Sequence, residues 1–172
     1  MDRIWAPWRK AYIRPKAQKQ KGCLFCRLHA ETSDAANYIL KRTSSSFAVL
    51  NIYPYNNGHT MIVPQRHVDS LHVLSDREKL DWLALYDETL AVMRKTLKPQ
   101  GFNVGINVGR VGGAGVPHHL HLHIVPRWKG DMNFMPVIAG TKVISESLDS
   151  VYRALRGNFK KVSQSGRRKH SG

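Results

Sequence analysis

Three histidines in the second half of the chain, His119, His121 and His123, alternate with leucine and isoleucine residues. Because successive side chains of a β-strand point to opposite faces, this spacing predicts three imidazoles on one face and an apolar row on the other. Neighbours on one face lie about 6.5–7 Å apart, so the rings would border a single site. An imidazole near neutral pH serves as a nucleophile, a general acid or base, or a metal ligand. His118 is out of step with this alternation, and we expect it to lie outside the row.

A glycine-rich segment, residues 109–115, comes shortly before the histidines. Backbone N–H groups in such a loop can approach an anion closely because no side chains block the way. We therefore expect Gly113, Ala114 and Gly115 to cradle a phosphate, with Arg110 adding a positive charge. A histidine beside such a cradle favours attack on phosphorus, with the N–H groups stabilising the negative charge that develops.

Two other interpretations of the histidines stay open at this point. A single histidine on a strand is often a hydrogen-bonded structural residue, although three at alternate positions beside a glycine-rich loop weigh against this. Three alternating imidazoles also suit the ligand set of a zinc hydrolase. The only nearby carboxylate that could complete a site for a harder cation is Asp131.

Cys23 and Cys26 are the only two cysteines of the chain. One Cys-x-x-Cys pair is weak evidence, because it fits a redox pair, half of a zinc site or chance. No strand–helix–strand pattern of the thioredoxin type surrounds the pair, which weakens the redox interpretation.

Apolar periodicity and turn signals predict the elements that position these residues. The expected strands are residues 38–42, 47–52, 59–63, 102–108 and 119–125. Ser75 and Glu78 have the spacing of a capping box, and they open a helix over 76–98. Its apolar residues recur at steps of three and four, and they are Trp82, Leu83, Tyr86, Leu90, Met93 and Leu97. A short helix around 146–155 follows. Consecutive strands with one intervening helix favour an antiparallel α+β sheet.

The composition fits one compact domain, with 172 residues of which 42% are hydrophobic. No apolar run approaches the roughly 20 residues that span a bilayer, and the first residues lack an apolar leader, so we expect a cytoplasmic protein. We divide the chain into an aromatic and basic arm (1–22), a main domain (23–157) and a basic, disordered tail (158–172). The arm carries Trp5, Trp8 and Tyr12, which we expect to dock on the domain or on a second subunit.

The net charge of +15 is concentrated at the two ends of the chain. Residues 1–22 carry +6 and residues 158–172 carry +5, which leaves +4 for the 135 residues between them. Such ends bind nucleic acid or other polyanions electrostatically, or they serve only as solvated, solubilising segments. The sequence leaves both possibilities open, and it confines any nucleic-acid contact to these ends.

These residues resemble the histidine triad (HIT) superfamily. The segment 119–125 matches the family signature of three histidines separated by apolar residues, and 50–68 resembles the second conserved block. The Trp5-Ala-Pro-Trp8 arm, the Gly-Arg-x-x-Gly-Gly loop and Pro126-Arg127-Trp128 resemble the Fhit-like branch. That branch includes bacterial diadenosine tetraphosphate hydrolases and phosphorylases. The resemblance covers residues 3–157 and implies a HIT-like antiparallel sheet of about five strands.

The resemblance implies a nucleotidyl hydrolase or transferase that cleaves dinucleoside polyphosphates at the α-phosphate. His121, the middle histidine, would form a nucleotidyl-histidine intermediate, while His119 and His123 position phosphate oxygens and assist the leaving group. Family positions also assign substrate contacts, at Asn51 for the ribose hydroxyls, at Asn107 for the phosphate or leaving group, and at His59. Many relatives carry Gln or Ser in the loop where this chain has Ala114 and Gly115, so the sequence leaves the final acceptor open between water and phosphate.

The resemblance further implies a structural zinc held by Cys23, Cys26, His67 and His119, a Mg²⁺ ion accompanying the polyphosphate, and a homodimer. Two thiolates and two imidazoles suit tetrahedral zinc. The alternative functions are a nucleoside phosphoramidase of the Hint type, which shares the fold, and a nucleic-acid-binding protein that uses the basic ends. No membrane partner is expected.

Overall fold

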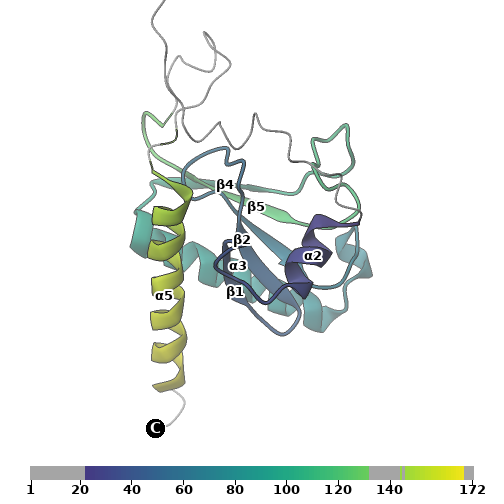
Figure 1. Cartoon of the computed structure of the whole chain (residues 1–172), viewed down its shortest axis with the longest axis horizontal. Coiled ribbons are helices and arrows are strands. Elements are labelled where there is room, and N and C mark those ends of the chain that lie inside the picture. The colour runs from purple at the N-terminus through teal and green to yellow at the C-terminus, as the bar shows by residue number, and fades with distance from the viewer. Residues whose placement is uncertain (1–21, 132–143, 145, 169–172) are drawn as a thin grey trace, which may run out of the picture.

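The computed structural model describes residues 22–131, 144 and 146–168 (Figure 1). The elements are α2 (Leu24–Ala30), β1 (Ile39–Arg42), β2 (Ser46–Leu50), β3 (Thr60–Pro64), the 3₁₀ turn η2 (Leu71–Val73), α3 (Asp76–Leu97), β4 (Gly101–Gly105), β5 (Leu122–Arg127) and α5 (Leu148–Arg168). The predicted arm lies outside the described residues apart from Gly22. Among the described residues, no helix is long and apolar enough to cross a membrane.

The five strands form one antiparallel sheet in the order β1-β2-β3-β5-β4. Residues of one β-strand alternate between the faces, so Ile62 and Ile124 lie in the core under α3 and α5, whereas Met61 and Val63 lie in the core under α2. The predicted α+β fold with a five-stranded antiparallel sheet is therefore confirmed. The histidine face of β5 is the α2 face, since His123 pairs with Met61.

α3 begins as predicted and packs by a slightly different stripe. Ser75 and Glu78 form the predicted capping box, in which each side chain accepts from the other residue's backbone N–H. Leu83, which we expected in the apolar stripe, is 49% exposed, while Leu85 is buried. The Trp82 indole N–H donates to the Ile62 carbonyl, and this bond fixes the helix over the centre of the sheet.

Three predicted element boundaries were wrong. β5 begins at Leu122, so His119 and His121 precede the strand, and the Leu120 N–H before it donates to the Val68 carbonyl in the loop after β3. β4 ends at Gly105, which leaves Asn107 in the following loop. The predicted short C-terminal helix runs from Leu148 to Arg168, well into the segment that we expected to be disordered.

The extension of α5 past residue 155 follows from a stripe of buried apolar residues that reaches Phe159. Val151, Leu155 and Phe159 recur every four residues, and all three are buried. This spacing places them on one helix face, which packs against α3 and β1. Figure 1 shows α5 beside the sheet with its C-terminal half extending past the other elements.

Candidate active site and metal centre

The His121 imidazole is held by a single backbone hydrogen bond. Its Nδ1 lies 2.7 Å from the carbonyl oxygen of His119. A carbonyl oxygen only accepts, so we assign the ring proton to Nδ1, which leaves the lone pair of the neutral ring on Nε2. The side chain is 3% exposed, so little of the ring is open to a ligand. The sequence predicted a nucleophile at this position, and the structure gives its ring the required tautomer.

His123 is oriented by a chain of hydrogen bonds that starts at a backbone amide. The Tyr55 N–H donates to His59 Nδ1 (3.0 Å), and His59 Nε2 lies 2.9 Å from His123 Nδ1. Because His59 Nδ1 accepts, its ring proton lies on Nε2 and is donated to His123 Nδ1. The neutral His123 ring therefore carries its own proton on Nε2. His59, which the resemblance gave as a substrate contact, thus lies in hydrogen-bond contact with the histidine row.

His123 Nε2 is buried and has no hydrogen-bond partner within the part of the chain that the structure describes. Leaving a buried N–H unpaired costs about 1–3 kcal/mol, so such a group is ready for an acceptor supplied by a ligand. Its ring centroid lies 4.9 Å from that of His121. Burial and the neighbouring His121 ring lower the pKa of His123 to about 4, so the ring is neutral at pH 7. Two neighbouring rings thus carry different groups on Nε2, a lone pair on His121 and an N–H donor on His123.

The glycine-rich loop uses part of its backbone for its own turn. The N–H groups of Gly113 and Ala114 donate to the carbonyls of Arg110 and Gly109. We predicted that these two N–H groups would be free to bind a phosphate, and that prediction was wrong. The bonds tighten the loop, and a side chain at Gly112 would place its Cβ 2.3 Å from the Val108 carbonyl oxygen. The correction follows from the compact turn, which satisfies its own polar groups.

The other predicted substrate contacts lie around this loop and the β2–β3 turn. Asn107 Nδ2 donates weakly to the Gly113 carbonyl at 3.4 Å, and Arg110 and Gly115 are exposed. Asn51 Oδ1 accepts from the Tyr53 N–H, and its Nδ2 lies 3.3 Å from His59 Nδ1. The Asn51 amide is therefore next to the His59–His123 pair.

The second cluster of functional residues is a set of metal donors beside the active site. One atom each from Cys23, Cys26, His67 and His119 lies within 4.8 Å of the other three. His119 Nδ1 is 3.2 Å from Cys23 Sγ and 3.7 Å from Cys26 Sγ, and His67 Nδ1 is 3.3 Å from Cys26 Sγ. Ligand atoms around tetrahedral zinc stand about 3.3–3.8 Å apart. The four residues that the resemblance implied are thus brought together with suitable spacing.

His119 has the tautomer that a metal ligand requires. Its Nε2 lies 2.8 Å from the Pro64 carbonyl and donates to it, which leaves the Nδ1 lone pair facing the two thiols. Burial lowers the pKa of His119, and this favours the neutral ring. The imidazole therefore lies in the metal cluster, whereas its backbone carbonyl reaches the active site. The expected contact of the His119 ring with phosphate is replaced by this carbonyl contact to His121.

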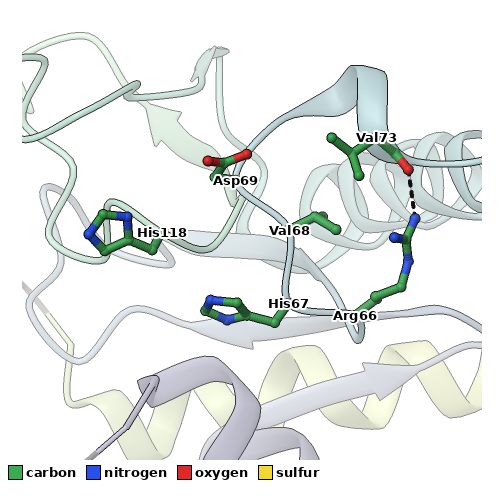
Figure 2. A pocket seen from close by; sticks show the side chains of 6 residues that line it. All are labelled: Arg66, His67, Val68, Asp69, Val73 and His118. Carbon is green, nitrogen blue, oxygen red and sulfur yellow. Dashed lines mark hydrogen bonds between the residues drawn. The ribbon is translucent and has the colours of Figure 1, made fainter.

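An open pocket of about 520 Å³ adjoins the metal cluster, on the side of His67 (Figure 2). It is lined by Arg66, His67, Val68, Asp69, Val73 and His118. The Arg66 guanidinium donates to the Val73 carbonyl and to Glu78, so its charge is already paired. His118 lines this pocket and is exposed, which confirms that it lies outside the histidine row. A second cavity, of about 450 Å³, lies between the β2–β3 turn and the start of α5, next to His59.

Two residues of the site were missed from the sequence. Tyr55 supplies a backbone N–H, which no side-chain pattern could reveal, and its ring packs 4.7 Å from the ring of His59. Phe25 packs against the rings of both His119 and His121. Its position between the two cysteines was a usable signal, because a residue between two metal donors is held close to them.

The fold and the site together define a histidine-triad protein. A family model described as the HIT domain matches residues 33–130 of the chain. The chain belongs to the HIT family.

Curated relatives narrow this comparison. The chain is 37% identical over 162 residues to a protein of Mycobacterium tuberculosis named AP-4-A phosphorylase, covering 90% of this chain and 83% of that protein. It is 32% identical over 107 residues to the asymmetrical bis(5'-nucleosyl)-tetraphosphatase of Schizosaccharomyces pombe, covering 62% and 58%. A Zn-bound histidine triad family protein from Mycobacterium smegmatis has the same fold, with a TM-score of 0.66 and 23% identity over 84% of this chain and 97% of that one.

Proposed function

We propose that the protein is a HIT-type enzyme that cleaves dinucleoside polyphosphates at the α-phosphate through a nucleotidyl intermediate on His121. One observation carries the proposal, namely that the His121 ring, whose Nδ1 is held by the His119 carbonyl, packs 4.9 Å from the His123 ring, whose buried Nε2 has no partner among the described residues. A nucleophile next to a donor without a partner fits attack on phosphorus, where negative charge gathers on the oxygens. The relatives named for diadenosine tetraphosphate chemistry support the same substrate class.

In the first chemical step, the rings of His121 and His123 have different roles. His121 Nε2 attacks the α-phosphorus, a nitrogen–phosphorus bond forms, and the bond to the bridging oxygen breaks with its electron pair leaving on the polyphosphate. His123 Nε2–H donates to a phosphate oxygen as charge develops. The modified His121 ring is positively charged, and the His119 carbonyl, which accepts its Nδ1–H, stabilises that charge. An acceptor oxygen then attacks the same phosphorus, and the imidazole leaves with its lone pair restored.

We propose inorganic phosphate as the acceptor, because the relative named a phosphorylase matches at 37% identity over 90% of this chain. The test is to incubate the protein with diadenosine tetraphosphate, with and without phosphate, and to identify the products. ADP and ATP formed only with phosphate support phosphorolysis, whereas AMP and ATP indicate asymmetric hydrolysis. No turnover under either condition would overturn the proposed function.

The Hint-type alternative has some support from an adenosine 5'-monophosphoramidase of Schizosaccharomyces pombe, which is 33% identical over 61% of this chain. This match covers a smaller share of the chain than the match to the phosphorylase, which covers 90%. Adenosine phosphoramidates tested beside diadenosine tetraphosphate distinguish the two activities. A higher kcat/KM on the phosphoramidate would favour the alternative.

We also propose that Cys23, Cys26, His67 and His119 hold a structural zinc ion. The donor set of two thiolates and two imidazoles is one that zinc prefers, and His119 Nδ1 already has its lone pair in the cluster. The ion would connect α2 to the segment before β5 and to the loop after β3. It would therefore stabilise the His119 backbone on which the His121 hydrogen bond depends.

A homodimer is proposed from the two edges of the sheet, which differ. At the β1 edge, the Tyr152 hydroxyl donates to the Ile39 carbonyl and Arg156 donates to the Leu40 carbonyl, so α5 caps that edge. β4, at the other edge, pairs only with β5 among the described strands, and Val104 is 44% exposed. An uncovered edge is a surface for pairing with a second copy. Sedimentation of the wild type and a Val104→Asp variant tests this, with the variant expected to be monomeric.

A further inference from the structure

Among the described residues, Phe25 alone makes ring contacts with both a metal donor, His119, and the proposed nucleophile, His121. It lies on α2 between Cys23 and Cys26, and it is 1% exposed. Its ring centroid is 5.3 Å from that of His119 at an interplanar angle of 71°, and 5.1 Å from that of His121 at 48°. The benzyl side chain has no metal-ligand atom and no proton to transfer.

The His121 ring needs such a contact because a single bond defines its orientation. Rotation about the bond between Cβ and the imidazole has a broad, roughly two-fold energy profile. A half-turn would replace Nδ1 by carbon at the His119 carbonyl and would break the 2.7 Å hydrogen bond. Without that bond, the proton could move to Nε2, and the lone pair needed for attack would be lost. Phe25 and His123 are the two rings that pack against His121 among the described residues.

Phe25 is itself fixed because α2 is held at both of its ends. At the N-terminal end, Cys23 and Cys26 face the imidazoles of the metal cluster. At the C-terminal end, Arg42 donates to the carbonyls of Leu28, His29 and Glu31. The short helix therefore cannot shift without disturbing one of these contacts. The contacts at both ends of α2 together fix the position of Phe25.

We infer that Phe25 is a positioning residue that keeps the His121 imidazole in the Nδ1–H tautomer and orientation required for attack. The inference rests on the proposed function, in which His121 is the nucleophile. It assigns α2 a role in the chemistry beyond supplying metal donors, because the helix also supplies the apolar surface against which the reacting ring packs.

Phe47 offers a matched control for the same substitution. It lies in the same apolar core under α2 and is 0% exposed. Its ring packs instead against His29, at 6.4 Å, and under the Arg42 guanidinium, at 5.8 Å. Phe25→Leu and Phe47→Leu should thus destabilise the same core to a similar degree, while only the first removes a ring contact with His121. Phe25→Met, which keeps most of the side-chain length, is the second variant should Phe25→Leu fail to fold.

The experiment measures kcat, KM and the tautomer of His121 in the metal-loaded protein. We expect Phe25→Leu to lower kcat on diadenosine tetraphosphate about 10- to 100-fold with KM within about two-fold, because the reacting atom is displaced rather than the binding surface. Long-range ¹H–¹⁵N spectra should show His121 changing from the Nδ1–H tautomer to a mixture, with the metal content unchanged. Phe47→Leu should keep both kcat and the tautomer.

The inference is overturned if Phe25→Leu keeps the kcat and the His121 tautomer of the wild type, or if Phe47→Leu changes both as much. The tautomer is measured without substrate, so it separates this inference from the proposed function. If the wild type fails to cleave diadenosine tetraphosphate but the tautomer still responds only to Phe25, the positioning role stands while the proposed function fails.

Discussion

The backbone carbonyl oxygen of His119 lies 2.7 Å from Nδ1 of His121, so the residue whose ring faces two cysteine thiols also fixes the ring proton of the proposed nucleophile. The first histidine of the row thus belongs to two sites at once. Its side chain is part of the metal cluster, and its main chain is part of the active site. Displacement of residue 119 should therefore affect both metal binding and chemistry.

Replacing the nucleophile should remove activity while leaving the fold. We expect His121→Gln to lower kcat by at least about 10³-fold, the scale seen when a covalent nucleophile is lost. His118→Gln is the matched control, since that histidine is exposed and lines the pocket beside the metal cluster (Figure 2). It should keep kcat within about two-fold. Turnover by His121→Gln at the wild-type rate would exclude a nucleotidyl intermediate at this residue.

The hydrogen bond from His59 to His123 should be worth about 10- to 100-fold in kcat, the range typical of groups that orient a functional imidazole. His59→Leu removes the Nε2–H donor that fixes the His123 tautomer at 2.9 Å. Since His59 also contacts Asn51, KM should rise slightly as well. His72→Leu, on the exposed turn η2, provides the comparison. Steady-state kinetics that show equal values for both variants would contradict the relay.

The stability of the protein should fall below neutral pH because of His123. Its pKa is lowered from 6.5 to about 4 by burial and by the His121 ring. The unfolded chain therefore binds more protons between these two values, so the stabilisation is complete above pH 6.5 and is lost as the pH falls toward 4. The loss amounts to at most about 3 kcal/mol. Urea unfolding at several pH values should show that the free energy of unfolding changes less with pH in His123→Asn than in the wild type. The same pH dependence in both proteins would mean that His123 is not the cause.

Metal loss should lower both stability and activity. We expect about one zinc ion per chain by elemental analysis, and a Cys26→Ser variant with much less. A structural zinc contributes several kcal/mol to folding, so treatment with a chelator should lower the unfolding temperature by several degrees. Arg66→Ala, beside the cluster but without a donor atom for the metal, should retain zinc. Full zinc content in Cys26→Ser would mean that the ion is held elsewhere.

Particular residues show which features of the site could be predicted from the sequence. The alternation of His119, His121 and His123 predicted a row of imidazoles on one face, and only the resemblance placed the first ring with the metal donors, where its Nδ1 lies 3.2 Å from Cys23 Sγ. The orientation of that ring depends on Pro64, whose carbonyl accepts the hydrogen bond from His119 Nε2. Such contacts join segments more than 50 residues apart, so only the tertiary structure reveals them. The extension of α5 past residue 155, in contrast, could have been predicted, because Phe159 continues the apolar spacing of Val151 and Leu155 in the sequence.

Two glycine-to-alanine substitutions should have opposite effects on stability. Gly58, in the turn that leads to His59, has a φ of +74°, and an added Cβ would lie 2.5 Å from Leu97 Cδ1. Alanine there is strained and must displace a packed side chain, so Gly58→Ala should destabilise the protein by about 1–3 kcal/mol.

Gly157, within α5, has open space around it and an ordinary backbone conformation. Gly157→Ala should therefore stabilise the protein by about 0.5–1 kcal/mol through helix propensity alone. Urea unfolding of the two variants checks both signs. Because the Gly58 turn carries His59 and, through it, the orientation of His123, Gly58→Ala should also lower kcat, whereas Gly157→Ala should leave kcat unchanged. If Gly58→Ala changes neither stability nor kcat, the β2–β3 turn tolerates a shift. The geometry of the His59–His123 hydrogen bond would then depend on the two rings alone.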